Sequence, residues 1–123
     1  VVHAHPRFCT ALACTGRAIP AFHYMVAIAG GDNIPLAPYA LFGTPQLSEH
    51  VVNALVNRQA CLLETHGMIA VGKGLDQAFN LAIEVETLAS HYVEALKIGG
   101  VRLLTTQQMA EVHKKFQHYG QRV

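Results

Sequence analysis

The sequence contains few charged residues, and those present are not gathered by sign. Charged residues make up 14% of the 123 positions, and the net charge is +1 with histidines neutral. The nine lysines and arginines are scattered along the chain. Nucleic-acid binding usually requires a basic patch or stripe, so we expect no nucleic-acid partner.

Cysteine pairs and long apolar runs are also missing. The three cysteines, Cys9, Cys14 and Cys61, lie in apolar segments without Cys-x-x-Cys spacing, which is typical of reduced core residues in the cytoplasm. No apolar run reaches the ~18 residues of a membrane helix, and no signal peptide pattern is present. We therefore expect a soluble, cytoplasmic protein without a membrane partner.

Hydrophobic residues make up 51% of the chain, enough for the packed core of one domain or part of one. Because Val1 lies inside an apparent strand, we expect the chain to be the C-terminal part of a longer polypeptide. The longest periodic segment, 75–98, predicts a helix that leaves Glu84, Glu86 and Glu94 in solvent. Its buried apolar stripe should consist of Phe79, Ala82, Ile83, Leu88, Ala89, Tyr92, Val93 and Leu96. Apolar spacing and the positions of Pro and Gly predict a first strand and a hairpin of 61–63 with 68–71. The same signals predict helices at 6–16, 22–28, 44–57, 75–98 and from 105.

Three histidines form a candidate metal site. His3 and His5 are two residues apart in the first strand, so both side chains project from one face. His66 lies at the turn of the predicted hairpin. Three imidazoles with one open position are typical of catalytic zinc. The alternative is that these histidines are hydrogen-bonded core residues, which is the commoner situation for a single buried histidine.

Several longer motifs together resemble the class II aldolase/adducin family. The resemblance extends over all 123 residues, nearly without gaps. The segments that carry it are Val1-Val2-His3-Ala4-His5, Ile19-Pro20-Ala21-Phe22-His23-Tyr24-Met25, Ala29-Gly30-Gly31, Ile34-Pro35-Leu36-Ala37-Pro38-Tyr39, Phe42-Gly43-Thr44, Leu47-Ser48-Glu49-His50, Thr65-His66-Gly67 and Lys115-Phe116-Gln117-His118-Tyr119-Gly120.

The resemblance implies an α/β fold, a three-layer α/β/α sandwich around a mainly antiparallel sheet. Residues 1–123 would be the C-terminal part of a single domain whose N-terminal part is missing. It also implies a homotetramer with active sites between subunits. Each subunit would hold one Zn²⁺, or another divalent ion, through His3, His5 and His66.

The implied activity is reversible cleavage of a ketose 1-phosphate to dihydroxyacetone phosphate and a small aldehyde such as lactaldehyde. Zinc would chelate substrate oxygens and stabilise the enediolate, so no Schiff-base lysine is needed. The resemblance places the proton donor to the aldehyde oxygen at Tyr24, acting on a neighbouring subunit. It places a C-terminal tyrosine that closes over the site at Tyr119, and an aromatic residue of the aldehyde pocket at Phe42.

Two departures from the family pattern matter. The family's acid/base glutamate and its phosphate-binding residues precede the first histidines and are absent from this chain. Glu64, two residues before His66, is a conceivable substitute ligand. Tyr24 and Phe42 could instead be packing residues, since aromatic side chains fill cores more often than pockets. Tyr119, next to Gly120, could belong to a frayed C-terminus.

Other activities of the family remain alternatives, namely sugar-phosphate epimerase, dehydratase or decarboxylase, and the non-catalytic structural role of adducin. Epimerases typically carry Thr-Thr-His-Ala-Asp-Tyr-Phe after the Pro-Ala pair, whereas this chain has Phe22-His23-Tyr24-Met25, which favours aldol cleavage. Retention of all three histidines argues against the structural role.

Overall fold

The computed structural model describes residues 1–121, with side chains described through residue 118. The first part of the chain contains a strand β1 (Val2–Ala4), a helix α1 (Arg7–Cys14), a 3-10 helix η1 (Tyr24–Ala29), a strand β2 (Leu36–Ala37) and a helix α2 (Pro45–Ala54). The hairpin strands β3 (Ala60–Leu63) and β4 (Gly67–Ala70) follow, and then the helices α3 (Leu75–Lys97) and α4 (Thr106–Gln121).

Four strands form one mixed sheet in the order β1-β4-β3-β2. The β3–β4 hairpin is antiparallel, as the sequence predicts, and β1 pairs antiparallel with β4 so that His3 lies opposite Ile69. Strand β2 pairs parallel with β3. The α/β class is thus confirmed, and the described strands show two antiparallel pairings and one parallel pairing.

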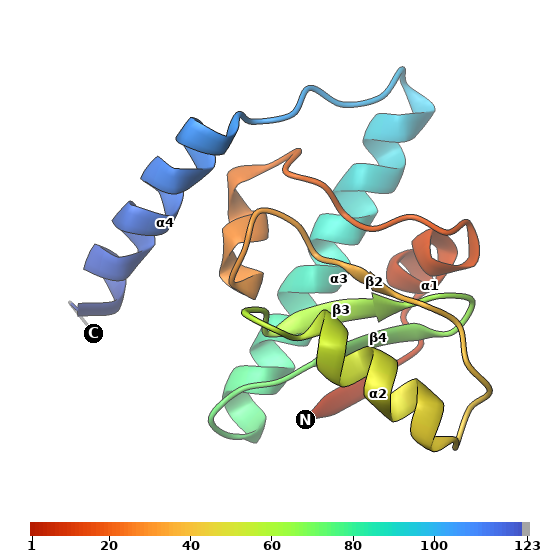
Figure 1. Cartoon of the computed structure of the whole chain (residues 1–123). Helices are drawn as coiled ribbons and strands as arrows, with labels where there is room; N and C mark the ends of the chain where they lie inside the picture. Colours follow the sequence, from red (N-terminus) through yellow and green to blue (C-terminus); the bar gives the residue numbers. More distant parts are fainter. Residues whose placement is uncertain (122–123) are drawn as a thin grey trace.

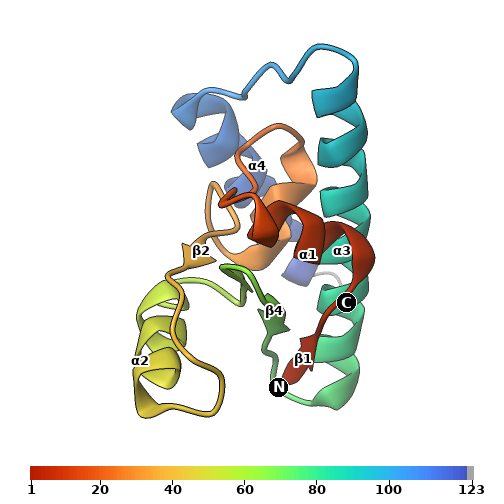
Figure 2. The same ribbon diagram turned by 90° about the vertical axis from the view of Figure 1, so that its right-hand side faces the viewer.

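Helices cover both faces of the sheet. Helices α1 and α3 lie on one side and α2 on the other (Figures 1 and 2). The larger core combines side chains such as Leu62 and Met68 with Leu12, Val85 and Leu88. The smaller one joins Ala37, Cys61 and Leu63 to partly buried residues of α2. Cys9 and Cys61 are buried as expected, but Cys14, the last residue of α1, is exposed, so its predicted burial is wrong.

The helix boundaries follow the local sequence signals. Thr44 caps α2 by accepting a hydrogen bond from the Leu47 N–H at 3.3 Å, and Pro45 occupies the first position, where its missing N–H is harmless. Gly16 follows α1 with a φ of 70°, a left-handed conformation that glycine adopts readily. These two helices therefore begin and end close to where the sequence predicts.

The buried face of α3 differs in part from the predicted stripe. Phe79 and Ile83 are 55% and 50% exposed, so their predicted burial is wrong. The first turns of α3 carry apolar residues on two sides, and the sheet covers the side of Ala78, Leu81 and Val85. Spacing alone cannot distinguish two apolar sides of one helix.

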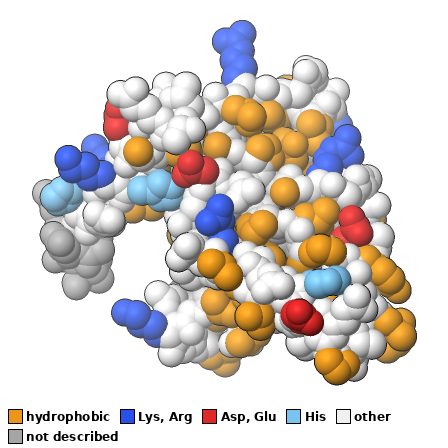
Figure 3. Space-filling model, viewed as in Figure 1, with side chains coloured by type: hydrophobic (Ala, Val, Ile, Leu, Met, Phe, Trp, Pro, Cys, Tyr) orange, Lys and Arg blue, Asp and Glu red, His pale blue; other side chains and the backbone are white. Residues whose placement is uncertain are grey.

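Helix α4 stands apart from the sheet and follows an extended segment (Figure 1). The Leu104 N–H donates to the Ala21 carbonyl at 2.8 Å, Met109 is buried, and His113 Nε2 lies 2.8 Å from Asp32 Oδ1. Lysines and arginines are spread singly over the face shown in Figure 3. Among the described residues, no helix is long and apolar enough to span a membrane.

Candidate metal centre

Three histidine side chains converge at one end of the β1–β4 pair. His3 and His5 come from β1 and the residue just beyond it, and His66 immediately precedes β4. One potential ligand nitrogen from each lies within 4.8 Å of the others, and every pair of ring centroids is 4.9 Å apart. Of the side chains described, these three are the ones that form such a group.

The nitrogens are spaced more widely than ligands already on one ion. Nitrogens bound tetrahedrally to zinc at about 2.1 Å are about 3.4 Å apart. The observed limit is 4.8 Å, so the exposed rings of His3 and His5 would turn toward each other and toward His66 when an ion binds. The donor set therefore fits a zinc-like ion with an open position.

His3 is held by a hydrogen bond to the neighbouring strand. Its Nδ1 lies 2.9 Å from the carbonyl oxygen of Met68. Because a carbonyl can only accept, Nδ1 carries the proton and the neutral ring presents the lone pair of Nε2. A backbone carbonyl that fixes the ring and its tautomer in this way is the usual support of a metal-binding histidine.

The turn that carries His66 is tied to three elements. The Glu64 N–H donates to Ala37 of β2 at 3.0 Å, the Thr65 N–H to Ala13 of α1 at 3.1 Å, and the His66 N–H to Leu63 at 2.9 Å. Thr65 has a φ of 55°, an unusual conformation for a β-branched residue. These bonds fix the backbone of His66 relative to α1 and to the sheet.

Gly67 lets the two halves of the site approach each other. A Cβ at this position would collide with the carbonyl oxygen of Ala4 and would lie 2.8 Å from Cδ2 of His5. The end of β1 and the His5 ring therefore pack directly on the Gly67 backbone. Gly67 belongs to the Thr65-His66-Gly67 motif, but the sequence carries no signal of this contact.

The electrostatic surroundings of His66 favour its neutral form. Burial lowers the pKa of His66, and the nearby His3 and His5 lower it further when they carry positive charge. His66 is consequently neutral near pH 7. A neutral imidazole is the form that binds a metal ion.

A pocket of about 960 Å³ opens beside the three histidines. Its walls are mainly apolar and include Leu47 and Val51 of α2, with Tyr39 and Phe42 from the preceding loop. Phe42, expected to contact substrate, is 75% exposed at this pocket. A small molecule bound there would have its polar end at the histidines and its other end on apolar side chains.

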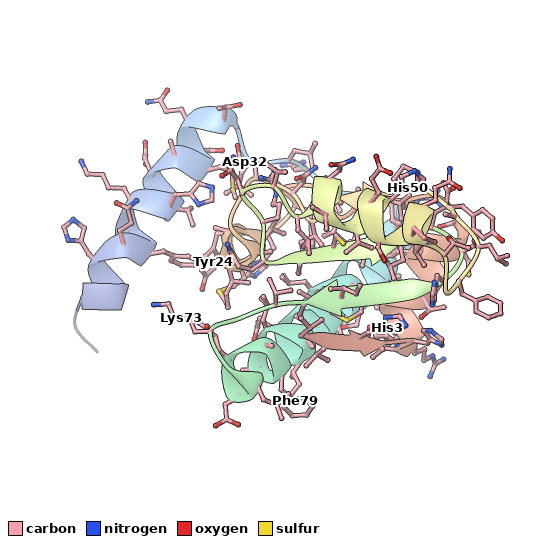
Figure 4. All side chains as sticks on the ribbon, turned by 60° about the horizontal axis from the view of Figure 1, so that its bottom comes forward. His3, Tyr24, Asp32, His50, Lys73 and Phe79 are labelled. Atoms are coloured by element: carbon pink, nitrogen blue, oxygen red, sulfur yellow. The ribbon has the colours of Figure 1, made fainter. Side chains whose placement is uncertain are left out.

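Tyr24 does not line this pocket. It begins η1, is 50% exposed, stacks on His23 with ring centroids 4.8 Å apart, and meets Phe116 of α4 edge-on. Figure 4 shows Tyr24 near α4 and His3 on β1, separated in this view. The pocket of one chain therefore includes the three histidines but not Tyr24.

Of two other expected residues, one lies outside the centre and the other has no described side chain. Glu64 is not grouped with the histidines, and its carboxylate accepts a hydrogen bond from the Tyr39 N–H at 3.3 Å. Tyr119 lies outside the residues whose side chains the structure describes.

The expectation that Glu86 faces solvent is wrong. Its carboxylate oxygens accept hydrogen bonds from the Phe8 and Cys9 N–H groups, each at 2.9 Å. Glu86 thereby connects α3 to the first turn of α1, directly after His5. No sequence signal marks this contact, because the partners are backbone groups more than seventy positions away.

Known proteins resemble the chain in sequence and structure. Residues 1–93 match the family described as Class II Aldolase and Adducin N-terminal domain. A 5-methylthioribulose-1-phosphate/5-deoxyribulose-1-phosphate aldolase of Rhodospirillum rubrum is 52% identical over 98% of this chain and 54% of its own length. An L-fuculose phosphate aldolase of Escherichia coli is 52% identical over 100% of this chain and 58% of its own length.

A solved structure of an L-fuculose 1-phosphate aldolase superimposes with a TM-score of 0.89 at 38% identity, covering 94% of this chain and 54% of that one. The chain thus spans just over half the length of the relatives it matches. The family match over residues 1–93, the identity of 52% and the similar structure agree with one another. The chain belongs to the class II aldolase and adducin family.

Proposed function

We propose that the protein is a metal-dependent carbon–carbon lyase that cleaves a ketose 1-phosphate reversibly. With L-fuculose 1-phosphate as substrate, the products are dihydroxyacetone phosphate and lactaldehyde. The observation that carries the proposal is the convergence of three imidazole nitrogens within 4.8 Å beside an apolar pocket of about 960 Å³. Relatives named as aldolases of phosphorylated sugars support it.

His3, His5 and His66 would hold one divalent ion, proposed to be Zn²⁺. When bound, such an ion supplies Lewis-acid polarisation of substrate oxygens. The chain itself orients the imidazoles through the Met68 carbonyl and the hydrogen-bonded turn at residues 64–66. The apolar wall with Phe42 would receive the aldehyde portion and limit the access of water.

Tyr24 is proposed to exchange a proton with the aldehyde oxygen. In condensation its hydroxyl donates a proton to the aldehyde carbonyl oxygen as the carbon–carbon bond forms, and in cleavage the same group takes the proton back. Its position away from the pocket of its own chain supports action on a neighbouring subunit. We therefore propose a homotetramer, located in the cytoplasm, with active sites between subunits.

The remaining features are proposed for the whole protein. Tyr119 would close over the site. Residues 1–123 would form the C-terminal part of one three-layer α/β/α domain with a mainly antiparallel sheet. The acid/base glutamate and the phosphate-binding residues would come from polypeptide outside this chain, in keeping with relatives of nearly twice its length.

An assay of the whole protein tests the reaction. L-fuculose 1-phosphate and 5-deoxyribulose 1-phosphate are each incubated with protein, and released dihydroxyacetone phosphate is measured with a coupled reductase. We expect release from at least one of them, abolished by a chelator and restored by zinc. Conversion to an epimeric sugar phosphate without cleavage would contradict the proposal.

A subunit mixture tests the role of Tyr24. Tyr24→Phe should retain zinc and lower turnover by about 10² to 10⁴, the usual contribution of a general acid. Mixing it with His66→Ala subunits should restore part of the activity, since some hybrid sites then contain both groups intact. Lack of complementation in mixtures shown to exchange subunits would contradict action across an interface.

A further inference from the structure

Helix α1 starts immediately beyond the metal centre without a capping group of its own. Its N-cap residue, Pro6, offers no side-chain acceptor, and its first turn contains no acidic residue. The amide hydrogens at a helix start require acceptors from elsewhere. Glu86 of α3 supplies two, because Oε2 accepts from the Phe8 N–H and Oε1 from the Cys9 N–H, both at 2.9 Å.

This contact is stronger than an ordinary cap. A carboxylate that accepts from backbone N–H groups forms charge-assisted hydrogen bonds, and its negative charge suits the positive end of the helix dipole. The first turn is also packed, since Cys9 is fully buried among core side chains. Burial raises the pKa of the Cys9 thiol and the nearby Glu86 charge raises it further, so this sulfur remains a neutral thiol.

His5 has few other constraints on its position. The β1–β4 pairing ends at Ala4, which leaves His5 one residue beyond the ladder. Unlike the His3 ring, the His5 ring has no hydrogen-bond partner in the described part of the chain, and it rests against Gly67. Its backbone is therefore fixed by Ala4 on one side and by the start of α1 on the other.

We propose that Glu86 is a positioning residue of the metal centre. By holding the Phe8 and Cys9 amides it fixes the first turn of α1, and through that turn it sets where the His5 imidazole lies relative to His3 and His66. Glu86 itself does not contact the site. This inference rests on the proposed metal centre and is independent of the aldol reaction.

Zinc affinity of a matched pair of variants tests the proposal. Glu86→Gln keeps the side-chain shape but removes the charge and one of the two acceptors. Glu84→Gln makes the same chemical change on the same helix and serves as the control. Within the described residues, the Glu84 side chain makes no hydrogen bond. Zinc affinity is measured by competition with a chromophoric chelator, and ligand geometry by the visible spectrum of the Co²⁺ form.

We expect Glu86→Gln to weaken zinc binding about tenfold or more, the scale found when groups that support metal ligands are altered. Its Co²⁺ spectrum should change, while Glu84→Gln should match the wild type in both measurements. A folded Glu86→Gln protein with wild-type zinc affinity and Co²⁺ spectrum would overturn the proposal. A wild-type protein that binds no zinc would overturn the metal centre itself.

A rescue variant separates positioning from general stability. Pro6→Ser places a hydroxyl at the N-cap, whose extended backbone, with φ of −73° and ψ of 156°, suits a serine accepting from Phe8 or Cys9. Added to Glu86→Gln, it should restore most of the zinc affinity. Restored thermal stability without restored affinity would contradict the proposal. If Glu86→Gln does not fold, the double variant is compared with Pro6→Ser alone. Equal zinc affinity and an equal Co²⁺ spectrum support action through the start of α1, and a clearly weaker affinity in the double variant overturns it.

Discussion

Replacing Gly67 with alanine should disturb the metal centre through a single methyl group. The added Cβ would overlap the Ala4 carbonyl oxygen and would lie 2.8 Å from His5 Cδ2. Carbon atoms in contact are normally about 3.5 to 4.0 Å apart, so the His5 ring has to withdraw by roughly 0.7 Å or more. The imidazole nitrogen would move by a similar amount relative to His3 and His66.

The expected magnitudes follow from this overlap. Forcing extra atoms into a packed site lowers the free energy of unfolding by about 1 to 3 kcal/mol. Zinc affinity should fall by about 10- to 100-fold, as it does when the support of a metal ligand is lost. Denaturant unfolding in chelator gives the first quantity, and competition with a chromophoric chelator gives the second.

Gly74→Ala is the matched control. Gly74 has an extended backbone, and no atom lies within 4 Å of a Cβ placed there. We expect its unfolding free energy to change by less than about 1 kcal/mol, as for an uncrowded helix start, and its zinc affinity to remain that of the wild type. If Gly67→Ala bound zinc within twofold of the wild type, the direct packing of His5 on Gly67 would not control the site.

Three further results are expected. Borohydride added during turnover should trap no substrate on a lysine, and a chelator should stop the reaction. A substrate–lysine adduct found by mass spectrometry would contradict metal dependence. In metal-free protein, His66 should titrate by NMR below its ordinary pKa of 6.5. Because the unfolded chain binds this proton more readily than the folded chain, the free energy of unfolding should fall as the pH drops through 6.5. A His66 midpoint above 6.5 would refute the reasoning. His113→Gln should lower the free energy of unfolding by less than about 1 kcal/mol, because the contact between His113 and Asp32 is partly exposed. A larger loss, measured by denaturant unfolding, would show that this contact holds α4 more firmly than its exposure indicates.

Local signals in the sequence predicted much of the fold. The pair Thr44-Pro45 predicted the start of α2, and the apolar runs on either side of His66 predicted the β3–β4 hairpin. The two-residue spacing of His3 and His5 predicted that their rings would lie together, as they do at 4.9 Å between centroids. These features depend on neighbouring residues, which makes them accessible to reasoning from periodicity.

Contacts between distant segments could not be predicted in the same way. Glu86 resembles any other charged residue on an amphipathic helix until α1 is packed against α3. The sequence also could not decide which apolar side of α3 faces the sheet, and Phe79 and Ile83 lie on the exposed side. The separation of Tyr24 from the pocket depends on the path of residues 15–38, where glycine and proline leave no periodic pattern.

Zinc stoichiometry in the His66→Ala variant tests whether His3, His5 and His66 together hold the metal ion. Wild-type and variant proteins are loaded with zinc, dialysed against a weak chelator and analysed for metal. The three-histidine centre predicts about one ion per wild-type subunit and almost none in the variant, because two imidazoles bind too weakly to retain it. Stoichiometric zinc in His66→Ala, or none in the wild type, would contradict the account.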